Sequence, residues 1–381
     1  VFYRATRAAR TWEEAVIASG GAVRPEKCYW TAIDFRWKNG KWSYMKMNEF
    51  QGEIWVKNTH GVKEKVKRFD VNRSKDGLGL HIHPDGSMDQ QIEFITEKIQ
   101  TWNGKLKRSA LSKHHTLIAA NTSIFRTIIY GLPGCCYSVM ECRKLENILY
   151  SDLMPKMGLS SKLPLPYRYG GLACQGIGLL HIHLQMLIEQ IRIFLEHIQL
   201  DTQLGVSYRA TLESAQLEIG SMSDLFSLPY HSYHFFTTDT WIKNLWFCLD
   251  RYKIKLKKAS SLFKPQREND ISLMDAVVKA KLFTNAELAK INLCRVYLRV
   301  FYLSDICSGN GRGLMHNYKI GYRSEQRISK WKWPRQQRPN AQAWKLWNAA
   351  LTDVWIRSET HSLLQPLGNW ITSSHQQFTF F

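Results

Sequence analysis

The hydrophobic pattern changes its period at Pro84-Asp85-Gly86. Before this turn, short aromatic and β-branched runs alternate with turn residues such as Asn39-Gly40, a pattern typical of β-hairpins. After it, apolar residues recur three and four positions apart, as on one face of a helix: Met88, Ile92, Ile95, Ile99, Trp102 and Leu106. The sequence therefore predicts a predominantly helical α+β fold, with one small N-terminal antiparallel sheet.

Further helices are predicted on both sides of this turn. A helix over about 4–18 ends at Ser19-Gly20-Gly21, a glycine stop signal. The later patterns predict helices over about 88–107, 112–130, 139–157, 177–200, 271–282 and 285–304, the last preceded by the capping-box spacing of Thr284 and Glu287. Three regions result: residues 1–86 with the small sheet, a helical region 87–222, and a basic, Trp-rich helical region 223–381.

The chain of 381 residues is strongly basic, with 52 Lys and Arg against 32 Asp and Glu and a formal net charge of +20. Such an excess is not needed for folding and adds self-repulsion, and its usual use is to bind a polyanion such as nucleic acid. The alternative is a protein whose charge serves only solubility.

No membrane-spanning segment is predicted, because the most apolar stretch, 178–198, is interrupted by several charged and polar residues. None of the eight cysteines forms a Cys-x-x-Cys pair. They are therefore expected to be reduced and mostly buried, as in an intracellular protein of the nucleus or cytoplasm.

Three candidate metal ligands lie close together at His81, His83 and Asp85. On a strand, residues two apart point to the same face, so the two imidazoles could chelate an ion. No cysteine or further histidine lies near them, so we expect ordinary strand side chains and no metal. A metal-dependent nuclease built on these residues is the least favoured alternative. In the second such pair, His181 and His183, the helical pattern points the two rings apart.

Two later segments combine cations with apolar or aromatic residues. On a strand, 251–258 would form a basic face of Arg251, Lys253, Lys255 and Lys257. The segment 330–339 mixes indole rings with cations, the combination that stacks on bases and neutralises phosphates; its candidates are Lys330, Trp331, Lys332, Trp333 and Arg335. A solvated edge strand protected by lysines is the alternative for the first segment.

The order of these signals resembles the C-terminal part of a non-LTR retrotransposon-type reverse transcriptase, from the end of the palm through the thumb to the downstream region. Gly20-Gly21 with Pro25 and Lys27 resembles the fourth palm motif, and Leu78-Gly79 resembles the primer-grip turn. Similar blocks continue at the PDG turn of 84–86, at 238–246 and at 333–347. The resemblance covers nearly the whole chain.

The resemblance implies roles for several residues. Lys27 would assist as a cation or proton donor near the departing pyrophosphate, the alternative being a surface lysine in a turn. Leu78 with Gly79 would position the primer end. The helix of 88–107 would be a thumb helix whose basic side chains face the template–primer phosphates: Lys98, Lys105, Lys107 and Arg108. The partners would be RNA and DNA, with neither a membrane nor a small-molecule substrate.

The catalytic carboxylates of such polymerases are missing from this chain, which contains no Asp-Asp dipeptide. Two Mg²⁺ ions need clustered carboxylates, so no cofactor is expected in this chain, and Mg²⁺ only with the rest of the palm. We therefore expect a polymerase fragment that begins downstream of the catalytic motif, binds nucleic acid and does not polymerise alone. The alternative is an inert or domesticated retroelement remnant that acts as a structural or interaction protein without nucleic-acid affinity. In that case Trp241, Trp246, Trp344 and Trp347 would serve only the core.

Overall fold

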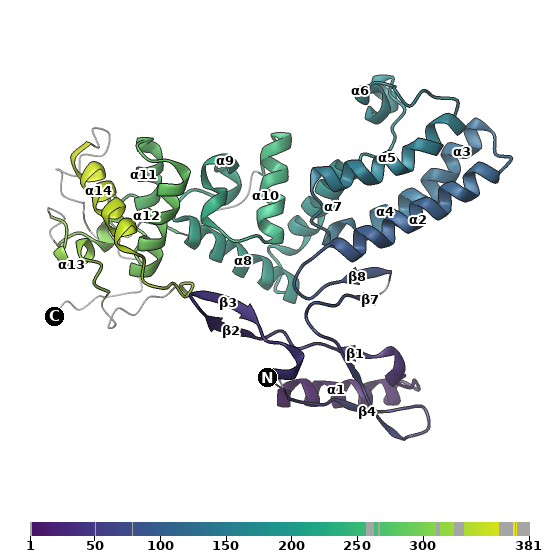
Figure 1. Cartoon of the computed structure of the whole chain (residues 1–381), viewed down its shortest axis with the longest axis horizontal. Coiled ribbons are helices and arrows are strands. Elements are labelled where there is room, and N and C mark those ends of the chain that lie inside the picture. The colour runs from purple at the N-terminus through teal and green to yellow at the C-terminus, as the bar shows by residue number, and fades with distance from the viewer. Residues whose placement is uncertain are drawn as a thin grey trace. The chain divides into compact units, whose positions relative to one another are not determined.

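The structure is a computed structural model that describes residues 2–49, 51–77, 79–256, 263–265, 267–309, 313–323, 331–357, 369 and 371. The chain forms two compact units, Val1–Met186 and Leu187–Phe381. The predicted boundary at 86/87 falls inside the first unit and that at 222/223 inside the second, so the three-region division remains a prediction. Helices predominate, as predicted, and the strands among the described residues all lie in the first unit (Figure 1).

The first helix ends where the glycine signal predicts. Helix α1 (Phe2–Ala18) is followed by Gly20 in the left-handed conformation, with φ of 79°. The Gly21 amide donates to the Val16 carbonyl at 2.9 Å, and the Gly20 amide donates to the Ile17 carbonyl at 3.0 Å. This pair of hydrogen bonds is the Schellman arrangement, which satisfies the last carbonyls of a helix.

The predicted predominantly helical α+β fold is confirmed, although the described N-terminal strands form four separate pairs and not one sheet. Three are antiparallel: β2 (Phe35–Lys38) with β3 (Lys41–Tyr44), β4 (Trp55–Lys57) with β5 (Lys63–Lys65), and β7 (Lys75–Gly77) with β8 (Leu80–Ile82). The fourth, β1 (Tyr29–Trp30) with β6 (Lys67–Arg68), is parallel. All of these strands are only two to four residues long, and local turns close the three antiparallel pairs.

A small core joins α1 to the strands below it. Val23, Ile54, Val56 and Val66 are buried together, and Val16 of α1 packs against them. Helix α1 contacts β4, and the two elements run side by side in Figure 1. The apolar side of α1 is therefore held by this cluster, and the other side faces solvent.

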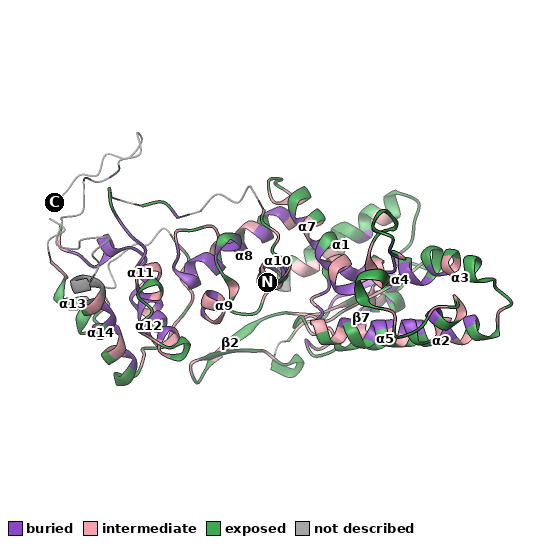
Figure 2. Cartoon of the chain, turned by 90° about the horizontal axis from the view of Figure 1, so that it is seen from above, coloured by how far each residue is buried: buried purple, intermediate pink, exposed green. Residues whose placement is uncertain are grey.

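A helical layer follows in the first unit. Its helices are α2 (Asp89–Arg108), α3 (Lys113–Ala119), α4 (Phe125–Gly131), α5 (Val139–Lys156) and α6 (Leu165–Tyr169). Helix α2 packs along α5, burying Ile95, Ile99 and Leu106, three positions of the predicted apolar stripe (Figure 2). Ala120–Ile124 forms a π-helical turn that joins α3 to α4 within the predicted helix of 112–130.

The boundary between the two units falls within α7 (Ile182–His197). The second unit continues with α8 (Gln203–Ile219), α9 (Tyr230–Tyr233), α10 (Trp241–Tyr252), α11 (Leu273–Ala280), α12 (Asn285–Leu298), α13 (His316–Lys319) and α14 (Ala341–Arg357). The capping box of Thr284 and Glu287 starts α12, as predicted. That helix ends earlier than expected, because Arg299 adopts the left-handed conformation with φ of 57°.

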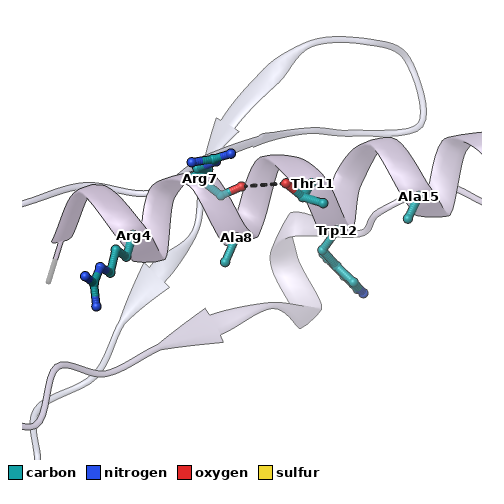
Figure 3. A pocket seen from close by; sticks show the side chains of 6 residues that line it. All are labelled: Arg4, Arg7, Ala8, Thr11, Trp12 and Ala15. Atoms are coloured by element: carbon teal, nitrogen blue, oxygen red, sulfur yellow. Dashed lines mark hydrogen bonds between the residues drawn. The ribbon is translucent and has the colours of Figure 1, made fainter.

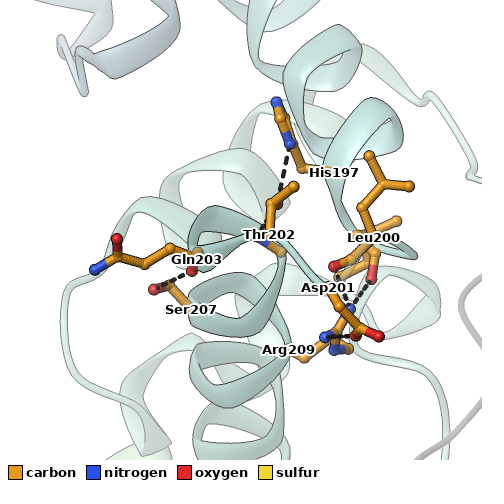
Figure 4. Close-up of polar contacts among 9 residues, drawn as sticks. His197, Leu200, Asp201, Thr202, Gln203, Ser207 and Arg209 are labelled. Atoms are coloured by element: carbon orange, nitrogen blue, oxygen red, sulfur yellow. Dashed lines mark hydrogen bonds and ion pairs between the residues drawn. The ribbon is translucent and has the colours of Figure 1, made fainter.

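The turn from α7 to α8 is held by Arg209 (Figure 4). Its Nη1 donates to the carbonyls of Ile198 at 3.0 Å and Leu200 at 2.8 Å, and its Nη2 donates to Asp201 Oδ1 at 2.8 Å. A cation that binds the last carbonyls of a helix also complements its dipole. Thr202 caps α8 by accepting from the Gly205 amide at 3.1 Å.

None of the described helices is both long and apolar enough to cross a membrane. All eight cysteines are free thiols, and five of them are buried: Cys135, Cys142, Cys248, Cys294 and Cys307. The prediction that most of the thiols are buried is confirmed. Burial raises the pKa of Cys135 to about 11, so this thiol stays protonated at neutral pH.

Candidate nucleic-acid interface

The outer face of α2 carries a stripe of cations. Lys98 and Lys105 lie seven residues apart, which places them on the same side of the helix about two turns from each other. Arg108 follows three residues later on the adjoining part of the face, and all three residues are exposed. The Lys98 ammonium also lies 5.1 Å from the centre of the Phe94 ring. The buried side with Ile99 is anchored on α5, so the stripe is presented outward from a fixed helix.

Lys107 does not belong to this stripe. It lies nine residues from Lys98, about half a turn round the helix. Its Nζ is 3.1 Å from Oδ1 of Asp152 on α5. Of the four predicted α2 cations, the structure therefore brings Lys98, Lys105 and Arg108 together and turns Lys107 toward a neighbouring carboxylate.

The predicted primer-grip turn lies at the end of the β7–β8 hairpin. Gly79 has φ of 79°, a conformation that glycine adopts without strain. Leu78 lies outside the described residues. The His81 amide on β8 donates to Gln91 Oε1 on α2 at 2.7 Å, and the side chain of Gln91 is buried. The hairpin is therefore hydrogen-bonded to the start of α2, the same helix that carries the cationic stripe.

The histidine pair beside this turn is used for packing. The His81 ring lies 4.7 Å from the Phe94 ring between centroids, and His83 Nδ1 lies beside the Asp85 carboxylate. Within the described part of the chain, no group of three His, Cys, Asp or Glu residues is arranged to hold a metal ion. His181 lies outside helix α7, just before its first residue, with Nδ1 3.2 Å from Glu146 Oε1.

Lys27 occupies a short 3₁₀ turn, Pro25–Lys27, where Pro25 is buried and Lys27 is exposed. This 3₁₀ turn comes shortly after Gly20-Gly21, where α1 ends. The residues that resemble the fourth palm motif therefore lie on one short segment. The exposed ammonium is available to an anion.

The predicted basic strand at 251–258 is wrong over its described residues. Arg251 lies in the last turn of α10, and Lys253 ends that helix in the left-handed conformation with φ of 56°. Residues 254–256 form no strand. The alternation itself is present, since Arg251, Lys253 and Lys255 are exposed while the residues between them are half-buried. The helical signal of 241–252, capped by Thr240, outweighs the period-two pattern at its end. Lys257 lies outside the described residues.

The indole rings of the 330–339 segment pack inward. Trp331 and Trp333 lie against a core cluster of Leu217, Phe263, Phe301 and Tyr302. The Trp331 ring is 4.5 Å from the Phe263 ring, whereas Lys332 and Arg335 are exposed. Lys330 lies outside the described residues. In this segment the two cations are therefore exposed and the two indoles half-buried.

Two further exposed surfaces were not predicted from the sequence. One is a shallow hollow along α1 lined by Arg4, Arg7, Ala8, Thr11, Trp12 and Ala15 (Figure 3). Arg4, Ala8 and Trp12 point to the same side of the helix in that view. The sequence feature that could have predicted this hollow is the spacing of the arginines by three in RATRAAR, followed by a tryptophan. The other surface is the β2–β3 hairpin, whose alternating aromatic residues were visible in FRWKNGKWSY.

No family model matches the chain, and no curated protein or solved structure matches it either. The first unit presents the α2 stripe beside the Gly79 turn. The second presents the exposed cations of 251–255 and of 332–335. These surfaces can neutralise anions, and the described residues around them bring together no catalytic cluster.

Proposed function

We propose that this chain is the end of the palm, the thumb and the downstream region of an RNA-directed DNA polymerase of a retroelement, and that it binds a template–primer duplex of RNA and DNA. The observation that carries the proposal is the stripe of Lys98, Lys105 and Arg108 on α2, directly after the hairpin with Gly79 at its turn. A nuclear or cytoplasmic location goes with this function.

The α2 stripe suits a duplex backbone for electrostatic reasons. Lysine and arginine side chains on an exposed helix face replace the counterions that surround phosphates, and the release of those ions drives binding. Phosphate contacts position a protein without recognising a base sequence. Rigid anchoring of α2 on α5 keeps the cations about 10 Å apart along the helix, since seven residues rise that far. Binding through this stripe would be strong at low salt and independent of sequence.

Polymerisation is not proposed for these residues. Nucleotide transfer in such enzymes needs two metal ions held by clustered carboxylates. The 381 residues contain no Asp-Asp pair. Lys27 would assist only within an enzyme that supplies that cluster. A primer-extension assay on this chain with Mg²⁺ should therefore yield no product, and clear extension would contradict the assignment.

The binding test compares two variants of α2. We expect Lys98→Gln/Lys105→Gln to weaken binding to an RNA–DNA hybrid by about tenfold at moderate salt, because two phosphate contacts are lost. Lys107→Gln is the matched control, since Lys107 faces Asp152. It should change the affinity by less than about twofold, because Lys107 lies about half a turn round the helix from Lys98 and outside the stripe. Fluorescence anisotropy of a labelled hybrid measures both. Equal effects of the two variants, or none, would contradict the proposed interface.

The second candidate is a structural or interaction protein without nucleic-acid affinity. It is favoured by the packing of tryptophans into the core of the second unit, where Trp246 and Trp347 are buried and Trp331 and Trp333 cover the cluster around Phe263. On this hypothesis the folded wild-type chain shows no affinity for the hybrid at any salt concentration. Alanine at Lys332 and Arg335 would then change no binding measurement.

A further inference from the structure

The two faces of the β2–β3 hairpin carry side chains of different chemical type. The register pairs Phe35 with Tyr44 and Trp37 with Trp42, and these pairs alternate with Arg36–Ser43 and Lys38–Lys41. Alternate pairs of an antiparallel ladder project to opposite faces. One face therefore carries four aromatic rings, and the other carries three cations and a serine.

The four rings form two cross-strand pairs on this face. The centroids of Phe35 and Tyr44 are 4.8 Å apart, and those of Trp37 and Trp42 are 5.0 Å apart with the rings at 71°. Asn39 and Gly40, with φ of 52° and 73°, close the hairpin in the mirror-image turn that matches the strand twist. The rings are therefore held by cross-strand contacts on a short ladder with a defined register.

Three of the four rings are exposed to solvent, and Trp37 is half-buried. Trp42 is 51% exposed, Phe35 47% and Tyr44 39%. In the described residues, β2 and β3 pair only with each other. Figure 1 shows the hairpin as an arm set apart from α1 and β4, and Figure 2 colours most of β2 as exposed. Exposed apolar surface of this kind is unfavourable in water, and a contiguous patch commonly marks a binding surface.

The positive charges of this hairpin indicate which class of partner its aromatic face binds. Lys38 and Lys41 lie directly opposite each other beside the turn, although like charges in this position destabilise a hairpin. No ion pair with a described carboxylate is formed by either lysine, whereas Arg36 at the base is paired with Glu49 at 2.9 Å. Two cations that have no described carboxylate as partner, at the tip of an aromatic arm, match a polyanion with flat, stackable groups.

We propose that the aromatic face of the β2–β3 hairpin binds single-stranded nucleic acid, with unpaired bases stacked on Trp42, Tyr44 and Phe35 and with the phosphate chain passing over the tip at Lys38 and Lys41. Aromatic side chains stack on any base, but only where the base is not already paired and stacked in a duplex. The site is separate from the α2 stripe, and its strand preference is opposite. It can therefore exist whether or not α2 binds a duplex.

The test measures single-stranded and duplex binding in the same variants of the full chain. The probes are a fluorescein-labelled oligo(dT) and the same oligonucleotide annealed to its RNA complement. We expect Trp42→Ala/Tyr44→Ala to weaken oligo(dT) binding at least tenfold, as expected when two stacking partners are lost. Binding to the annealed duplex should stay within about twofold, because base pairing hides the stacking faces. Trp42→Phe/Tyr44→Phe keeps two rings and should restore most of the affinity for oligo(dT).

Trp12→Ala is the matched control, because Trp12 on α1 is 50% exposed, almost the same as Trp42. It should leave oligo(dT) binding unchanged. An unchanged affinity of Trp42→Ala/Tyr44→Ala for oligo(dT) would overturn the proposal, and so would an equal loss on oligo(dT) and on the duplex. If sedimentation shows that the wild type dimerises and that only this variant is monomeric, with oligo(dT) affinity unchanged, the face is an interface between two copies.

A second measurement leaves the hairpin intact. An oligo(dT) that carries 5-iododeoxyuridine cross-links under ultraviolet light to aromatic rings stacked on it. We expect adducts on the peptide that contains Trp42 and Tyr44, and weaker labelling in Lys38→Gln/Lys41→Gln. Adducts found only at other tryptophans of the wild type would overturn the proposed site.

Discussion

Arg295 shows at the level of one residue how the second unit is held together. This guanidinium is completely buried, yet it donates to four acceptors: Asn292 Oδ1 at 2.7 Å and the carbonyls of Val300 at 3.3 Å, Leu217 at 2.6 Å and Glu218 at 2.7 Å. Gly220 makes room for it, since a Cβ there would lie 2.6 Å from Arg295 Cζ. The planar fork of arginine suits this site better than the single ammonium of lysine.

Removal of this guanidinium should destabilise the protein strongly. We expect Arg295→Met to lower the free energy of unfolding by about 3–5 kcal/mol, because it leaves buried carbonyls without donors and nearby carboxylates without a countercharge. Arg251→Met, at an exposed position of α10, should cost less than about 1 kcal/mol. Urea unfolding followed by circular dichroism measures both. Similar midpoints for the two variants would contradict this role of Arg295.

Asp224 gives the second unit a predictable dependence on pH. Burial raises the pKa of this carboxyl to about 6, although the backbone amides of Phe226 and Leu225 oppose the shift. An aspartate with a pKa above its unfolded value of about 4 favours the folded state when protonated, so its ionisation reduces stability as the pH rises from about 4 to about 6. Above about pH 6 the loss of folding stability stays constant.

Replacement by asparagine removes the charge and keeps a side-chain acceptor. We expect Asp224→Asn to raise the free energy of unfolding at pH 7.5 by about 1–2 kcal/mol, with the gain shrinking as the pH approaches 4.5. Urea titrations at both pH values measure the difference between variant and wild type. The same gain at both values would show that ionisation of Asp224 is not its source.

At the scale of the helices, two glycines with similar backbones should respond oppositely to alanine. A Cβ on Gly205 of α8 would lie 2.3 Å from the carbonyl oxygens of His197 and Leu200, whereas a Cβ on Gly104 of α2 would meet nothing within 4 Å. The α7–α8 turn thus depends on close backbone approach at Gly205. The outer side of α2 has no such requirement.

Gly205→Ala should lower the thermal midpoint, because the clash with two carbonyls outweighs the better helix propensity of alanine. Gly104→Ala should raise it slightly, by the effect of about 0.5–1 kcal/mol that alanine contributes in a helix interior. Differential scanning calorimetry compares the two variants with the wild type. A stabilised Gly205→Ala would mean that α7 and α8 move apart without cost.

For the whole molecule, the net charge of +20 leads to a prediction about salt. If this charge serves nucleic-acid binding, the logarithm of the binding constant for an RNA–DNA hybrid should fall linearly with the logarithm of salt concentration, by about 0.7–0.9 for each phosphate neutralised. Anisotropy titrations over a range of NaCl concentrations measure the slope. A flat response would indicate that the charge serves solubility alone.

Local features of the fold could be predicted from the sequence because their partners lie a few residues away. The stop at Gly20-Gly21, the turn at Asn39-Gly40 and the capping box of Thr284 and Glu287 all formed where the residues indicated. The apolar stripe of α2 was also predicted, since a period of three and four places its members on one face. Each of these features depends on backbone geometry or on hydrogen bonds within one or two turns of the chain.

The tertiary structure decided which side chains of the candidate interface are available. Lys107 and Lys105 look alike in sequence, but Asp152 on α5 engages only Lys107. Trp331 and Trp333 look like stacking residues, but a cluster assembled from distant segments covers them. The aromatic residues of β2 and β3 look like core residues, but no described strand pairs with the hairpin. The sequence alone determined the positive charge, the local turns and caps, and several of the helices. Exposure depends on contacts between residues far apart in the chain, which only the packed structure specifies.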